Sequence, residues 1–179
     1  MAPMIIVVMG VAGSGKTTVG TKLAAALRCA FLEGDDLHSQ ANVEKMSRGV
    51  PLTDADRAPW LDAIHGRMCD AFTAGQSLVV ACSALERSYR ARLAEGLPVT
   101  WVYLKGSADL IRSRLQHRTH HFMKANMLAS QFDVLEEPSD AIIVDIAQPP
   151  DAIVERILAG VSHPSTAGAS TPPRSPGDA

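Results

Sequence analysis

The chain has 179 residues, of which 46% are hydrophobic and 20% are charged, and its formal net charge is −2. This length fits one domain with a substantial core, and the near-neutral charge excludes a global positive field that would attract nucleic acid or anionic lipid. The apolar runs are strand-sized, so we expect no membrane span. Three widely spaced cysteines, Cys29, Cys69 and Cys82, are expected to be small buried hydrophobes in a reducing, cytoplasmic compartment.

The first predicted strand, residues 4–9, leads into a phosphate-binding pattern at residues 10–17 and then into a helical pattern. Glycines let backbone N–H groups converge on an anion, and the helix N-terminus adds the positive end of its dipole. The rival dinucleotide fingerprint requires glycine at position 18, where the chain has threonine. We therefore predict a nucleoside triphosphate site in which Lys16 acts catalytically on the β- and γ-phosphates and the Thr17 hydroxyl binds Mg²⁺. The predicted ATP-binding residues of the loop are Gly10, Val11, Ala12, Gly13, Ser14, Gly15, Lys16, Thr17 and Thr18.

The second predicted strand, residues 30–32, ends in acidic side chains. In an open parallel sheet, ligands collect at the carboxyl ends of the strands, so these acids should face the γ-phosphate. Phosphoryl transfer to an alcohol uses a carboxylate that orients the hydroxyl and accepts its proton. We assign Asp35 to that role and Glu33 to Mg²⁺ or its waters. If the chain stays extended, these two residues share a face and Asp36 faces away; the structural alternative is a set of acids that cap a loop.

Further strands are predicted at residues 78–82, 99–104 and 142–146, alternating with helical patterns. Their hydrophobicity is continuous, which is typical of parallel strands covered on both faces. This pattern predicts an α/β, doubly wound parallel sheet of about five strands with helices on both faces. One domain is expected over residues 1–161, followed by a disordered tail, residues 162–179, which is rich in Ser, Thr, Pro, Gly and Ala.

The helix boundaries also follow from local chemistry. Thr53 and Asp56 resemble a capping arrangement for a helix that ends at Gly75, Ser107 can cap another helix, and Pro150 suits the start of the last one. These signals predict where the helices between the strands begin and end.

Sequence blocks beyond the phosphate loop resemble one family. They are Phe31-Leu32-Glu33-Gly34-Asp35 with Leu37-His38, Pro51-Leu52-Thr53-Asp54, Cys82-Ser83-Ala84-Leu85, His121-Phe122-Met123 and Ser130-Gln131-Phe132. Over about residues 4–160 the chain resembles the gluconokinases of the small, adenylate-kinase-like type. The resemblance implies a P-loop kinase fold of the nucleoside and shikimate kinase kind, ATP and Mg²⁺ as cofactors, D-gluconate as substrate, 6-phospho-D-gluconate as product, and a possible homodimer. No nucleic acid or membrane partner is expected.

The resemblance also implies a division of labour along the chain. Residues 38–75 would form the substrate-binding helical region and residues 117–127 a short lid. A sugar acid needs a planar cationic group for its carboxylate and polar groups for its hydroxyls. The residues expected to bind the substrate are Asp35, His38, Arg57, Ser83, Arg87 and His121, with Arg57 and Arg87 on the carboxylate. Arg118 would be the catalytic lid cation, Arg114 a further ATP contact and Gln148 an adenine contact.

Other polar residues receive structural interpretations. Arg90 and Arg92 are expected on a solvated helix face and His65 in a structural role, and the histidines at 117, 120 and 121 lack the spacing of a metal site. Two residues depart from the family pattern. Glu86 stands at a position that is usually basic in the family, and His120 stands where the family commonly has glycine.

Three alternatives remain open at this point. A shikimate or other polyhydroxy-acid kinase is the nearest, although shikimate would favour a triple-glycine turn where this chain has Ser83-Ala84-Leu85. A catalytically silent nucleotide-binding module would tolerate the loss of Asp35, which this chain keeps. A nucleoside monophosphate kinase would carry an extended lid.

Overall fold

The computed structural model describes residues 2–116 and 125–162. These residues form a five-stranded sheet in the order β2-β3-β1-β4-β5, and every neighbouring pair of strands is parallel. The strands are β1 (Ile5–Met9), β2 (Ala30–Glu33), β3 (Leu78–Ala81), β4 (Val99–Lys105) and β5 (Ile142–Asp145). The predicted α/β fold with a doubly wound parallel sheet is confirmed.

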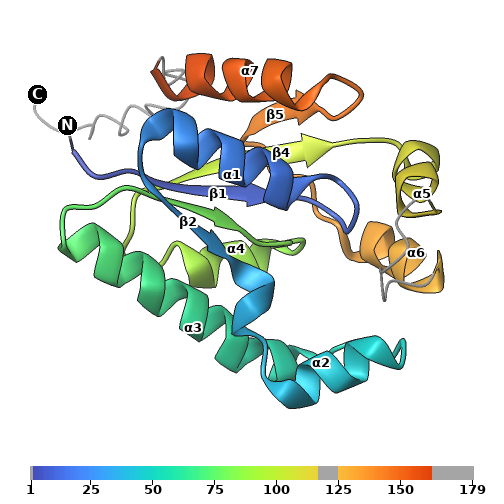
Figure 1. The fold of residues 1–179 in the computed structure, drawn as a ribbon. Coiled ribbons are helices and arrows are strands. Elements are labelled where there is room, and N and C mark those ends of the chain that lie inside the picture. The colour runs from blue at the N-terminus through green and yellow to red at the C-terminus, as the bar shows by residue number, and fades with distance from the viewer. Residues whose placement is uncertain (1, 117–124, 163–179) are drawn as a thin grey trace, which may run out of the picture.

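Helices cover both faces of the sheet (Figure 1). On one face lie α1 (Lys16–Leu27) and α7 (Pro150–Ser162), and on the other lie α3 (Asp54–Thr73) and α4 (Arg87–Leu93). Alternate residues of β1 enter the two cores: Ile6 and Val8 pack with α1 and α7, whereas Ile5, Val7 and Met9 pack with α3 and α4. The central strand is therefore apolar on both faces, which explains its unbroken hydrophobic sequence.

Shorter elements surround the carboxyl end of the sheet. They are the 3₁₀ helix η1 (Gly34–Leu37), α2 (Gln40–Ser47), α5 (Ala108–Gln116) and α6 (Ala125–Val134). Two predicted helix starts are confirmed by their caps. Thr53 and Asp56 form a reciprocal capping box at α3, and the Ser107 hydroxyl accepts the Leu110 N–H at 3.3 Å before α5.

The structure corrects three sequence-based expectations. After β2 the chain turns at once into η1, so the extended alternation expected to separate Asp35 from Asp36 does not exist. Cys82 is buried, and burial raises its pKa to about 12, but Cys29 and Cys69 are only half-buried. Arg90 is 7% exposed rather than solvated. Among the described helices, none combines the length and apolar character needed to cross a membrane.

Candidate active site

The phosphate loop joins β1 to α1 and leaves an open cradle in front of the helix. Gly13 and Gly15 have φ angles of +78° and +96°, in the left-handed region that favours glycine. A Cβ added at Gly15 would meet no atom within 4 Å, so this part of the loop faces free space. The first N–H groups of a helix have no partner inside it, so those at the start of α1 are available to an anion held by the loop. The loop therefore has the shape and polarity of an anion site.

Two side chains of the loop, those of Lys16 and Ser14, are placed where they could contact the phosphates of a nucleotide. The Lys16 Nζ donates to the carbonyl oxygens of Gly10 and Val11, each at 3.1 Å, which holds the ammonium group beside the loop. The Ser14 hydroxyl is buried and has no hydrogen-bond partner among the described residues. A buried hydroxyl without a partner costs free energy, and phosphate oxygens would satisfy it.

A threonine and a carboxylate meet at the start of α1. The Thr17 hydroxyl donates to Glu33 Oε2 at 2.5 Å, and Glu33 Oε1 accepts the Asp35 N–H at 3.5 Å. Hydroxyl and carboxylate oxygens are the ligand atoms that Mg²⁺ prefers. Mg²⁺ commonly uses one or two protein oxygens together with substrate phosphates. No group of three or more His, Cys, Asp or Glu residues that could hold a metal occurs in the described part of the chain. The pair fits a metal that is shared with a nucleotide.

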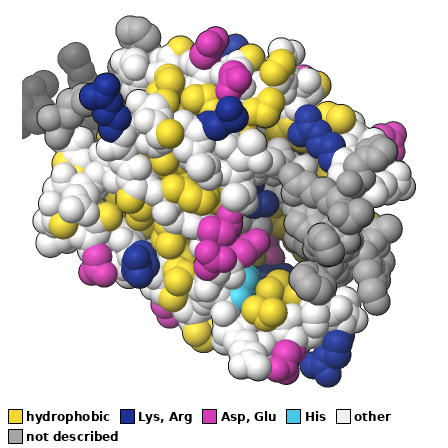
Figure 2. Space-filling model, viewed as in Figure 1, with side chains coloured by type: hydrophobic (Ala, Val, Ile, Leu, Met, Phe, Trp, Pro, Cys, Tyr) yellow, Lys and Arg dark blue, Asp and Glu magenta, His cyan; other side chains and the backbone are white. Residues whose placement is uncertain are grey.

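The loop opens into a cavity of about 530 Å³ at the carboxyl end of the sheet. Figure 2 shows the hollowed face, with acidic and histidine side chains gathered at its margin. Asp35 lines this cavity and Asp36 does not, although the extended backbone assumed for the choice between them does not exist. The predicted residues that line the cavity are Ala12, Gly13, Gly15, Lys16, Thr17, Thr18, Glu33, Asp35, His38, Arg57 and Ser83.

His38 is held rigidly at the cavity wall. Its ring stacks on Trp60 with centroids 4.2 Å apart and planes 13° apart, and the Trp60 indole donates to the Gly34 carbonyl at 2.7 Å. The Asn42 amide nitrogen donates to the Asp56 carbonyl at 2.9 Å and lies 3.3 Å from His38 Nδ1. An amide nitrogen only donates, so Nδ1 accepts and the neutral ring carries its proton on Nε2. Burial lowers the pKa of His38, with Asp35 opposing this, so the neutral ring is favoured.

Arg57 is oriented by a chain of hydrogen bonds. Its Nη1 donates to the Tyr89 hydroxyl at 3.2 Å, and that hydroxyl donates to Asp54 Oδ1 at 2.6 Å. The guanidinium also lies 5.6 Å from the centre of the Tyr89 ring. Burial and the hydrogen bond to Asp54 raise the pKa of Tyr89, which keeps the phenol protonated and able to donate. Arg57 was identifiable from the sequence but Tyr89 was not, because no local pattern joins residues 32 positions apart.

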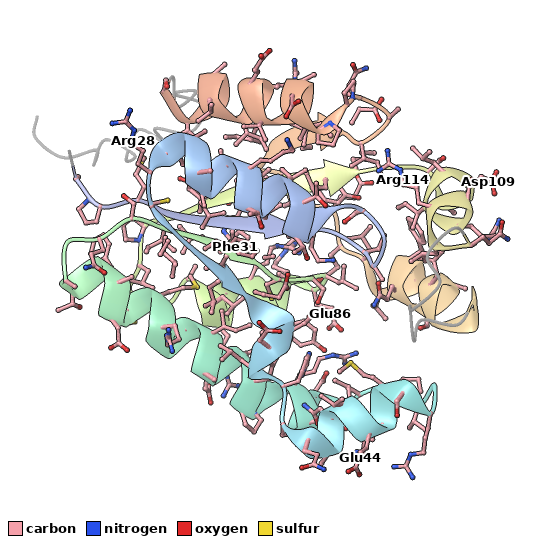
Figure 3. The ribbon with its side chains drawn as sticks, in the orientation of Figure 1. Arg28, Phe31, Glu44, Glu86, Asp109 and Arg114 are labelled. Atoms are coloured by element: carbon pink, nitrogen blue, oxygen red, sulfur yellow. The ribbon has the colours of Figure 1, made fainter. Side chains whose placement is uncertain are left out.

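The turn after β3 forms another part of the wall. Its Ala84 has a φ angle of +45°, and the buried Arg90 stabilises the turn by donating to the carbonyls of Ala84 and Leu85 at 2.9 and 3.1 Å. The turn also contacts the phosphate loop, since the Gly10 N–H donates to the Ser83 carbonyl at 3.3 Å. Glu86 lines the cavity (Figure 3), so the departure at this position lies inside the candidate site.

Several predicted residues do not reach the cavity lining. Arg87 lies beside it on a shallow surface depression, where its backbone N–H donates to Glu136. Arg114 reaches from α5 to the carbonyl of Ile146 after β5 (Figure 3). Gln148 is exposed after the same strand. Arg118 and His121 lie outside the described residues, as do His117, His120 and most of the expected lid. Other lining residues were missed by the sequence reasoning; Trp60, Tyr89, Ser130 and Gln131 are among them.

Comparison with known proteins gives concordant results. A family model described as an AAA domain matches residues 5–138. A gluconokinase of Gluconobacter oxydans is 48% identical over 162 residues, covering 88% of this chain and 91% of that protein. The thermoresistant gluconokinase of Escherichia coli is 45% identical over 155 residues, covering 84% and 89%. The crystal structure of a gluconokinase from Sinorhizobium meliloti superposes with a TM-score of 0.81 at 47% identity, covering 89% and 92% of the two chains.

Proposed function

The chain belongs to the gluconokinase family, and we propose that it transfers the γ-phosphoryl group of ATP to the 6-hydroxyl of D-gluconate, giving 6-phospho-D-gluconate and ADP. The observation that carries this proposal is the lining of one cavity. The same cavity is lined by Lys16 and Thr17 of the phosphate loop, by Asp35 and by Arg57. It therefore combines a site for the nucleotide phosphates, a general base and a cation for the substrate carboxylate.

The acceptor side of the cavity suits a polyhydroxy acid. Arg57 presents a planar guanidinium that can bind the substrate carboxylate through paired N–H groups. His38 offers an Nε2–H donor from a ring fixed by Trp60 and Asn42, which suits a sugar hydroxyl. The proposal also assigns Ser83, on the turn after β3, to the substrate. Arg87 and His121 stay predictions as substrate contacts, because the first lies beside the cavity and the second outside the described residues.

The reaction assigns one task to each residue. Asp35 accepts the proton of the attacking hydroxyl while the new O–P bond forms and the bond from the γ-phosphorus to ADP breaks. Lys16 and the loop amides stabilise the charge on the phosphoryl oxygens. Thr17 and Glu33 would hold Mg²⁺, which neutralises phosphate charge when bound. Arg118 stays a prediction for the lid cation, as do Arg114 and Gln148 for further ATP contacts.

The test is a coupled ADP-release assay with gluconate, shikimate, glucose, glycerate and nucleoside monophosphates as acceptors. Gluconate should give the highest kcat/KM by a wide margin. A higher value for any other acceptor, or ADP release that needs no acceptor, would reject the proposal.

The variant Asp35→Ala tests the mechanism separately. It should bind ATP nearly normally and lose about 10²- to 10⁴-fold in kcat, the usual contribution of a general base. Gluconate turnover at the wild-type rate would reject the role of Asp35. The substitution Lys16→Ala should instead weaken both nucleotide binding and turnover.

We also propose that the chain forms a homodimer and that it is located in the cytoplasm. The first is tested by light scattering on purified protein and the second by fractionation of cells that produce the tagged chain.

A further inference from the structure

One contact at the phosphate loop has no part in the proposal above. The Gln131 side chain, on α6, accepts the backbone N–H of Ala12 at 2.7 Å, although the two residues are 119 positions apart. A backbone N–H can only donate, so the carboxamide oxygen must face Ala12 and the carboxamide NH₂ must face elsewhere. Among the described residues, this NH₂ has no hydrogen-bond partner. Gln131 lines the same cavity as Gly13, Gly15 and Lys16, so its free end is a donor beside the anion site.

The peptide that Gln131 holds is fixed from both ends. The carbonyl of this peptide belongs to Val11 and accepts the Lys16 ammonium at 3.1 Å, while its N–H belongs to Ala12 and binds Gln131. The Val11–Ala12 peptide thus contacts Lys16 through its carbonyl and Gln131 through its N–H. The NH₂ and the oxygen of the carboxamide share one carbon atom, so the NH₂ also lies close to the phosphate loop. The ligand atoms nearest to it would be oxygens of the phosphates that the loop binds.

The end of α6 also contacts the acceptor side of the cavity. Just beyond the helix, the Glu136 N–H donates to the Leu85 carbonyl at 2.9 Å, and the Glu136 carboxylate accepts the Arg87 N–H. Leu85 lines the cavity on the turn after β3. The segment that carries Gln131 therefore lies between the phosphate loop and the acceptor wall, where the last phosphate of a bound nucleotide has to sit for transfer.

We propose that Gln131 binds the terminal phosphoryl group of the nucleoside triphosphate, its carboxamide oxygen fixing the Ala12 peptide and its NH₂ donating to a terminal phosphate oxygen. This assignment rests on the proposed function only in requiring that a nucleoside triphosphate binds at the loop. It makes Gln131 the residue that distinguishes ATP from ADP at this wall of the cavity.

Two substitutions separate this role from a purely structural one. Gln131→Glu keeps an acceptor for Ala12 but places an anionic oxygen where the NH₂ was. Gln131→Met removes both polar ends and adds no charge. If the NH₂ binds the terminal phosphate, the Glu variant should bind a non-hydrolysable ATP analogue about tenfold or more weakly, the Met variant should lose less, and ADP affinity should change little in both. If Gln131 only supports the loop, the Met variant should be the weaker one and ATP and ADP affinities should fall together, which overturns the proposal.

The measurement is calorimetric titration of each nucleotide with Mg²⁺ present and no acceptor. Gln76→Glu, an exposed position after α3, adds the same charge away from the cavity and should bind both nucleotides like the wild type. Thermal melting checks that each variant is folded. Because no gluconate is used, the expected order of variants can hold even if the wild type fails to phosphorylate gluconate, so the two failures are distinguishable.

Discussion

The hydroxyl of Tyr89 offers a sharp test of how the cavity orients its cation. The substitution Tyr89→Phe keeps the ring but removes the atom that accepts from Arg57 and donates to Asp54. The Arg57 side chain is 28% exposed, so its guanidinium can swing toward solvent once that hydrogen bond is gone. We expect the gluconate KM to rise while ATP binding stays unchanged, because the phosphate loop does not contact this pair.

The size of the effect follows from the two bonds. A hydrogen bond with one charged partner contributes about 1.5–3 kcal/mol. The bond from Arg57 is 3.2 Å long, and the Asp54 side chain that supports it is 85% exposed, which places the effect at the lower end of that range. A loss of about 1.5 kcal/mol corresponds to about a tenfold rise in KM.

The assay is steady-state kinetics with gluconate varied at saturating ATP. Tyr103→Phe is the matched control, because Tyr103 is a buried tyrosine on β4 that does not line the cavity, and burial together with Glu137 raises its pKa to about 12. This control variant should lose stability without a change in KM. A gluconate KM within twofold of the wild type in Tyr89→Phe would refute the idea that this hydroxyl orients Arg57.

Three further predictions test the cavity and the fold. Arg57→Ala should raise the gluconate KM by about tenfold to a hundredfold with ATP affinity intact, whereas Arg92→Ala, at an exposed pair with Asp62, should leave both unchanged in the same kinetic assay. Asp56 has its pKa lowered to about 2, first by the hydrogen bond from Lys45. Its ionised form therefore stabilises the fold above about pH 4, and this stabilisation is lost as the pH falls toward 2, so urea unfolding of Asp56→Asn should depend less on pH in that window. Ile64 is fully buried, and Ile64→Ala should lower the free energy of unfolding by about 2–5 kcal/mol, far more than Ile143→Ala at a 42% exposed position; equal losses would contradict the assigned core.

The fold was predictable because its signals are local. Five apolar runs, separated by helices with identifiable caps, predict a parallel sheet covered on both faces, and the strands lie within one or two residues of the expected bounds. The phosphate loop was equally predictable, because its glycines, Lys16 and Thr17 occupy fixed positions between a strand and a helix.

The acceptor side of the cavity depended on contacts between distant segments. Arg57 lines the cavity as expected, whereas Arg90, expected on a solvated helix face, is buried under the turn after β3. The position of Asp35 at the carboxyl end of β2 was predictable, but its separation from Asp36 was argued from an extended strand, and the chain bends into η1 there.

The sequence by itself determined which segments form strands, where the capped helices begin and where the phosphate loop lies. Each of these features depends on residues a few positions apart. Only the tertiary structure decided which polar side chains share a cavity. Asn42 fixing the ring of His38, Tyr89 orienting Arg57 and Gln131 holding Ala12 all join separate elements, and such contacts exist only after the sheet and its helices have packed.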